Sequence, residues 1–168
     1  AVDNGAKVIN MSFGKSFSFN KEVVDEAIKY AASKDVLLVH AAGNDSQDND
    51  QADNFPNDKA TDGKEYVNNW MEVGASSWQP AEKGVGSFSN YGKTSVDIFA
   101  PGVDVYSTIP GSKYKNNQGT SMAAPVVAGV AALVRSYFPK LTAPQVKEIL
   151  MKSAVPYKDK VIVPGSEE

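Results

Sequence analysis

The most informative run in the sequence is Gly119-Thr120-Ser121-Met122-Ala123-Ala124-Pro125-Val126-Val127-Ala128-Gly129. From Met122 to Val134 the chain contains only alanine, valine, leucine, methionine, glycine and proline, with no charge. A helix that is apolar on every side is a buried helix. Pro125 would break a helix interior, but in the first turn its missing N–H costs little. The stretch therefore predicts a buried central helix from about Ser121 to about Tyr137.

The hydroxyl at the start of this helix has two interpretations. The first amides of a helix are unpaired and its dipole is positive there, so a nucleophile at Ser121 would have stabilisation for an oxyanion built in. Gly119 would leave room for close approach of a substrate. Alternatively, Thr120 or Ser121 only caps the helix, which is the more common role of such a residue. The position alone leaves both open.

The segments before this helix predict an α/β fold with a mostly parallel β-sheet flanked by helices. Apolar runs at 7–14, 36–39 and 71–75 are typical of buried strands, and a helix capped by Asn20 is expected from Lys21 to about Ser33. Continuous apolar strands that alternate with a helix favour a parallel sheet covered on both faces.

The later segments predict smaller elements. The runs 96–99 and 103–106 are expected to be peripheral strands around a turn at 100–102. Thr142 and Gln145 have the spacing of a capping box that opens a last helix. The polar, acidic segment from Asp45 to about Asn69 is expected to be a long loop.

Composition excludes several classes of protein. A chain of 168 residues with 42% hydrophobic and 22% charged residues is expected to form one globular domain. It has no apolar run near the ~20 residues that span a bilayer, and its net charge of −3 does not favour nucleic acid as a partner. The absence of cysteine and the single histidine, His40, exclude thiolate and multi-histidine metal sites. We therefore expect no cofactor and no metal site.

The stretch 119–129 closely resembles the nucleophile signature of the subtilisin-like serine proteases, the subtilases of peptidase family S8. Other stretches resemble this family in the family's own order, and the resemblance runs from about Asn4 to about Ala154. These stretches are Val8-Ile9-Asn10-Met11-Ser12-Phe13-Gly14, Ala41-Ala42-Gly43-Asn44, Ser87-Phe88-Ser89-Asn90-Tyr91-Gly92 and Ala100-Pro101-Gly102.

The resemblance implies a role for each matching residue in a serine endopeptidase. Ser121 would be the acyl-forming nucleophile, and Asn44 would donate its amide to the oxyanion together with the Ser121 N–H. Without the resemblance, Asn44 would be taken for a turn residue. The substrate-binding residues would be two pocket walls and the glycine before the nucleophile, namely Ser12, Phe13, Gly14, Ala41, Ala42, Gly43 and Gly119. Alternatively, the residues of the two walls are ordinary strand ends that pack on helices.

The family's catalytic aspartate and histidine have no counterpart in the chain. Both lie before the first strand in the family, so residues 1–168 are expected to be the C-terminal portion of a single catalytic domain, an incomplete domain that is inactive alone. His40 stands where the family usually has a small residue, and is expected to be a packed or partly exposed strand residue, not the base. Strand 8–11 would lack a neighbour, and the chain could self-associate through that edge.

Two further readings of the whole chain stay open. The parent could be a pseudoprotease or binding module that retains the subtilase scaffold, although a pure binder needs neither Ser121 nor Asn44. The fragment could also be only a structural half. If the parent is an active protease, its partner would be a peptide or protein substrate. The family resemblance also implies an exported protein.

Competing motifs fail on their context. Ser12-x-x-Lys15 needs a helical turn, whereas Gly14 ends a strand, and Gly119-x-Ser121-x-Ala123 needs a later histidine. The acidic loop 45–62 has no known calcium-loop spacing, although calcium in the parent is compatible with the family, and it is expected to be solvated.

Overall fold

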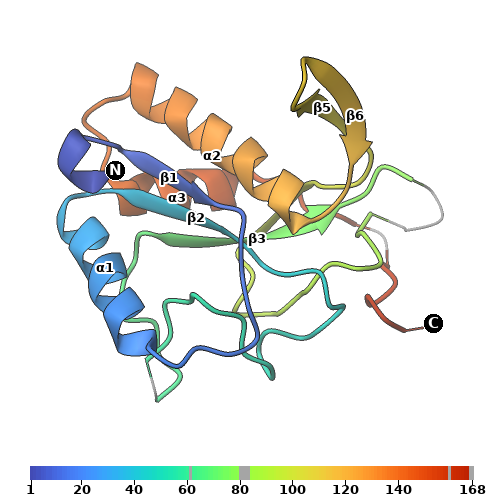
Figure 1. The fold of residues 1–168 in the computed structure, drawn as a ribbon, viewed down its shortest axis with the longest axis horizontal. Helices are drawn as coiled ribbons and strands as arrows, with labels where there is room; N and C mark the ends of the chain where they lie inside the picture. Colours follow the sequence, from blue (N-terminus) through green and yellow to red (C-terminus); the bar gives the residue numbers. More distant parts are fainter. Residues whose placement is uncertain (61, 80–83, 159, 167–168) are drawn as a thin grey trace.

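The chain folds around a four-stranded parallel sheet with the strand order β1-β2-β3-β4. The computed structural model describes residues 1–60, 62–79, 84–158 and 160–166. The strands are β1 (Val8–Met11), β2 (Leu37–Ala41), β3 (Trp70–Ser76) and β4 (Ile98–Pro101). Helix α1 (Lys21–Ser33) covers one face, while α2 (Thr120–Tyr137) and α3 (Ala143–Ser153) cover the other (Figure 1). The predicted α/β class is confirmed.

The two faces of the sheet have separate cores. Leu37, Val39 and Ala41 alternate along β2 onto the α2 and α3 side, where alanines of α2 allow close packing. Leu38 and Trp70 face the opposite side and pack with Ile28 of α1. The sheet is therefore buried on both faces, which explains why its strands are continuous apolar runs.

The central helix is buried on one side only, so the prediction of burial all round is wrong for the described structure. Ala123, Ala124, Val127 and Ala131 are buried against the sheet, but the opposite face exposes apolar side chains. These are Val126, Val130, Leu133 and Tyr137, with exposed fractions of 38, 44, 61 and 78%. The described residues supply cover for one side of a helix whose sequence is apolar on both.

The predicted peripheral strands and their Pro-Gly turn need correction. Ala100 and Pro101 lie inside β4, which pairs with β3 in the main sheet. The residues after it form a separate antiparallel hairpin of β5 (Val105–Ile109) and β6 (Lys113–Asn117). The sequence Lys-Tyr-Lys-Asn-Asn of β6 has no apolar alternation and is mostly exposed, so its pattern did not predict a strand.

Helix starts were predicted more accurately. Thr142 is the N-cap of α3, its hydroxyl accepts from the Gln145 N–H at 3.4 Å, and the Gln145 side chain accepts from the Thr142 N–H at 2.9 Å. Asn20 is the N-cap residue of α1 but makes no side-chain cap bond. A short 3-10 helix (Val2–Asn4) precedes β1. Within the described ranges, no helix has the length and apolarity needed to cross a membrane.

A buried cation joins α2 to the amino ends of β1 and β2. Arg135 is 7% exposed and donates to the carbonyls of Lys7 at 3.1 Å and Asp35 at 2.8 Å, as well as to the Asp35 carboxylate. That carboxylate also accepts from the Ala143 N–H at 2.6 Å. Burial raises the pKa of Asp35, but the bonds from Ala143 and Arg135 outweigh it and hold the pKa below its usual value. Arg135 and Asp35 together thus connect two strands and two helices.

Replacing Arg135 by methionine is expected to lower the free energy of unfolding by about 2 to 4 kcal/mol, because Asp35 loses its cation and its carbonyl loses a donor. Urea denaturation followed by circular dichroism measures the change. Because the pKa of Asp35 is lowered in the fold, its contribution is complete above about pH 4 and is lost as the pH falls below it. Arg135→Lys keeps the charge without the fork and should lie between the two. Equal urea midpoints for Arg135→Met and the unmodified protein would contradict this role.

Candidate active site

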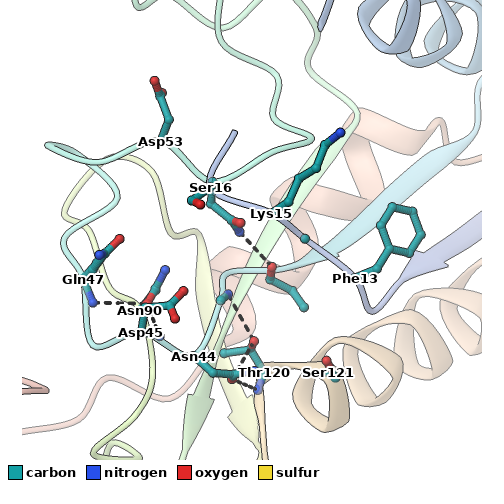
Figure 2. Close-up of a pocket in the computed structure, with 14 residues that line it drawn as sticks. Phe13, Lys15, Ser16, Asn44, Asp45, Gln47, Asp53, Asn90, Thr120 and Ser121 are labelled. Carbon is teal, nitrogen blue, oxygen red and sulfur yellow. Dashed lines mark hydrogen bonds between the residues drawn. The ribbon is translucent and has the colours of Figure 1, made fainter. Parts of the chain in front are cut away.

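A cavity of about 440 Å³ lies where β1 and β2 end and α2 begins (Figure 2). The carboxyl ends of neighbouring parallel strands meet at one edge of the sheet, so the segments after β1 and β2 are brought together there. Six of the predicted site residues line the cavity, namely Phe13, Gly14, Ala41, Gly43, Asn44 and Ser121. Ser12, Ala42 and Gly119 do not line it, although each is next in sequence to a residue that does.

Ser121 lies in the first turn of α2, next to the segment that follows β1. Its Oγ donates to the Ser12 carbonyl at 3.3 Å, and the Ser12 Oγ donates to the Ser121 carbonyl at 2.8 Å. Gly119 is the N-cap residue, with a φ of 141° that favours glycine. The backbone N–H of Ser121 has no hydrogen-bond partner among the described residues. A hydroxyl and an unpaired backbone donor therefore belong to one residue at the cavity.

Asn44 follows β2 and is held by the start of α2. Its Oδ1 accepts from the Thr120 N–H at 2.8 Å and from the Thr120 hydroxyl at 3.1 Å (Figure 2). A backbone N–H can only donate, so the atom that it meets must be the amide oxygen, which fixes the orientation of the Asn44 side chain. The Nδ2 donor has no partner among the described residues. Asn44 and Ser121 together thus present two unpaired donors at one cavity.

The turn between β2 and Asn44 requires glycine. Gly43 has a φ of 108°, and a Cβ there would lie 2.4 Å from the Nδ2 of Asn90. Asn90 is almost fully buried, and its Oδ1 accepts from the N–H groups of Asp45 at 2.8 Å and Gln47 at 3.1 Å. Thr120 contributes again by accepting from the Gly43 N–H at 3.1 Å. Thr120 and Asn90 were not predicted to shape this turn, because their partners lie more than 40 residues away in sequence.

The two predicted walls face each other with Asn54 between them. A Cβ on Gly14 would lie 2.8 Å from the Asn54 Oδ1, so this wall has no room for a larger residue. The Asn54 Nδ2 donates to the carbonyls of Ala42 at 2.9 Å and Ala41 at 3.3 Å. Ala42 itself is completely buried, so it supports the second wall. Asn54 lies in the polar loop, where no sequence pattern distinguished it.

The acidic loop packs against the chain more closely than the expected solvated loop. Asp50 accepts from the backbone and hydroxyl groups of Thr94 and Ser95, and these bonds outweigh burial and hold its pKa well below the usual value. Burial, with the nearby Glu65 carboxylate, raises the pKa of Asp58 to about 7. Within the described parts of the chain, no group of three or more acidic or histidine side chains could hold a metal ion.

His40 is completely buried and lies away from Ser121. Its Nδ1 meets the Glu72 carboxylate at 2.9 Å, and its Nε2 meets the Phe13 carbonyl at 2.7 Å. Both ring nitrogens are thus occupied, which leaves neither for the Ser121 hydroxyl. Of the two predicted placements, packed or partly exposed, the structure has the packed one.

Comparison with known proteins gives the chain's relationships. The family model described as the subtilase family (Peptidase S8) matches residues 1–166. Subtilisin-like protease 2 of Plasmodium falciparum is 41% identical over 150 residues, which is 88% of this chain and 10% of that protein. Subtilisin DY of Bacillus licheniformis is 39% identical over 156 residues, covering 92% of this chain and 52% of the relative.

The structural comparison agrees with the sequence comparison. The crystal structure of a cold adapted subtilisin-like serine proteinase superposes with a TM-score of 0.76 at 33% identity, over 97% of this chain and 54% of the other. The chain thus spans about half or less of the length of these relatives. With a family model that covers nearly all of its residues, the chain belongs to the subtilase family.

Proposed function

We propose that this chain supplies the nucleophile, the oxyanion donors and the substrate walls of a serine endopeptidase. The observation that carries the proposal is the Ser121 hydroxyl beside two unpaired donors, the Ser121 N–H and the Asn44 Nδ2, at one cavity. Such donors stabilise the negative charge that develops on a carbonyl oxygen during acyl transfer.

In the proposed reaction, the Ser121 Oγ attacks the carbonyl carbon of a peptide bond and forms a tetrahedral intermediate. Its oxyanion accepts from the two donors while a general base takes the Ser121 proton. The intermediate then collapses: the C–N bond breaks as the base passes that proton to the leaving amine, and the acyl group stays on Ser121 as an acyl-enzyme. Water then attacks the acyl-enzyme in the same way and releases the acid. The Gly14 and Ala41–Gly43 walls would hold the side chain that precedes the cleaved bond.

The base and its orienting aspartate belong to sequence outside residues 1–168 in this proposal. Three observations support an N-terminal part of the same catalytic domain: the single partner that β1 has among the described strands, the exposed apolar face of α2, and the half-length match to the relatives. An unpaired strand edge and an exposed apolar helix face are surfaces that folded domains cover. Export from the cell is part of the same proposal and rests on the family.

Ser121 is expected to carry the covalent adduct when the full-length protein reacts with a fluorophosphonate probe, because among the described residues only this serine lies beside the proposed oxyanion donors. Mass spectrometry of the labelled peptides locates the adduct, and Ser121→Ala should abolish it. Ser33→Ala, at the exposed end of α1, is the matched control and should label normally. Labelling of another serine would refute the assignment, and no labelling of any serine would favour a pseudoprotease.

Asn44→Ala in the full-length enzyme is expected to lower kcat by about 10²- to 10³-fold with little change in KM, the size known for loss of one oxyanion donor in subtilisin. Because Asn44 also accepts from Thr120, Asn44→Asp separates the two roles: it keeps the acceptor and removes the donor. Steady-state kinetics on a peptide anilide should show both variants impaired in kcat. A defect confined to KM would mark Asn44 as a binding residue.

The 168-residue chain alone is expected to show no useful peptidase activity, since a serine hydroxyl without a base is a weak nucleophile and the nitrogens of His40 are occupied. Addition of the separately produced N-terminal part should restore turnover of casein and reduce self-association through β1 and α2, as measured by light scattering. Robust turnover by the chain alone that is lost in His40→Ala would overturn this division of the triad.

A further inference from the structure

A fully satisfied polar cluster lies behind the substrate wall, on the α1 side of the sheet. His40 of β2 and Glu72 of β3 are adjacent in the strand register, and neither the mechanism nor the cavity uses them. Their exposed fractions are 0 and 6%. The Glu72 carboxylate meets His40 Nδ1 at 2.9 and 3.0 Å and accepts from the Trp70 Nε1–H at 2.8 Å.

The proton positions in this cluster follow from the partners. The Phe13 carbonyl can only accept, so the Nε2 of His40 carries a hydrogen. The other ring nitrogen, Nδ1, faces the Glu72 carboxylate at 2.9 and 3.0 Å. With a partner on each side of the ring, Glu72 fixes the orientation in which the His40 Nε2–H donates to Phe13.

The Phe13 carbonyl is the point at which this cluster reaches the proposed site. Phe13 lies after the end of β1, where the backbone has left the parallel ladder. The Ser12 carbonyl meets the Ser121 hydroxyl, on the α2 side, whereas the Phe13 carbonyl meets His40, on the α1 side. Among the described residues, the N–H and C=O of Gly14 have no partner. Holding the Phe13 carbonyl on the α1 side therefore determines how the Gly14 backbone groups are presented.

We propose that His40, oriented by Glu72, is a positioning residue that holds the Phe13 carbonyl and keeps the backbone of the first wall ready to pair with an extended peptide. This inference rests on the proposed function and adds a determinant of substrate affinity to it. The cluster acts on binding of the extended peptide backbone, because the hydroxyl and the oxyanion donors are held separately by Ser12 and Thr120.

The competing explanation is that the cluster only stabilises the fold. A double variant, His40→Leu with Glu72→Leu, separates the two, because replacing both members of a buried polar pair by apolar residues leaves no unpaired charge and is often tolerated. Glu72→Gln is the conservative variant: its amide can donate to Nδ1 while its carbonyl accepts from Trp70. Arg135→Met is the control for lost stability, about 20 Å along α2 from Ser121.

The test compares an extended peptide anilide with a small acyl ester in the full-length enzyme, with active sites counted by fluorophosphonate labelling. The double variant is expected to raise KM for the peptide about 10- to 100-fold, with kcat per labelled site and ester hydrolysis unchanged. In Glu72→Gln, KM for the peptide should stay within about twofold of the value for the unmodified enzyme. In Arg135→Met, KM should be unchanged. An unchanged KM in the double variant, or an equal loss for ester and peptide, overturns the inference.

Amide hydrogen exchange keeps the inference separate from the proposed function. Lys15 lies two residues after Phe13, and its N–H donates to the Phe55 carbonyl at 2.9 Å. This N–H should exchange faster in the double variant but not in Glu72→Gln. If the unmodified protein neither reacts with the probe nor hydrolyses the peptide, the proposed function fails. Faster exchange of the Lys15 amide in the double variant would still support the hydrogen bond from His40 as what holds the Phe13 carbonyl. Unchanged exchange at Lys15 in the double variant overturns this role of His40, whether or not the protein is an active enzyme.

Discussion

The two hydrogen bonds that Thr120 makes to Asn44 are the interaction on which the site depends. They join the first residue of α2 to the turn after β2, and the Gly43 N–H adds a third bond to the same hydroxyl. Thr120 is completely buried, so its own atoms in these bonds are shielded from water. Because Ser121 is the next residue, its hydroxyl is placed by a contact that it does not make itself. The Asn44 amide is therefore positioned by the residue before Ser121, whose own hydroxyl also donates to the Ser12 carbonyl.

The sheet provides the frame for this contact, and its two faces differ in kind. The face under α2 and α3 is built from aliphatic side chains and alanines, which allow a helix to approach closely. The face toward α1 contains Trp70 and the buried pair of His40 and Glu72. The groups proposed to react are thus carried by an apolar, close-packed layer, while a polar layer lies behind the proposed substrate wall. Each layer holds a different part of the same segment after β1.

The features predicted well from the sequence are local ones. The start of α2 follows from Pro125 and the uncharged run after it, and the start of α3 from the spacing of Thr142 and Gln145. The roles of Asn54, Asn90 and Thr120 could not be predicted, because each depends on a backbone group far away in the chain. The burial of α2 was overestimated for a related reason: the apolar pattern says that a face needs cover, not where the cover comes from. Ser121 and Asn44 came from resemblance, since position alone favoured a cap and a turn.

The bond between the Ser12 side chain and the Ser121 carbonyl spans 109 residues of chain. Contacts of this separation form late, after the loop between them has closed, and parallel sheets depend on many of them. During synthesis, Ser121 is made long after the walls and Asn44, and no pocket exists until α2 packs on the sheet. A nascent or partly unfolded chain therefore carries Ser121 without the neighbouring unpaired donor of Asn44. The proposed site forms only when the fold is complete.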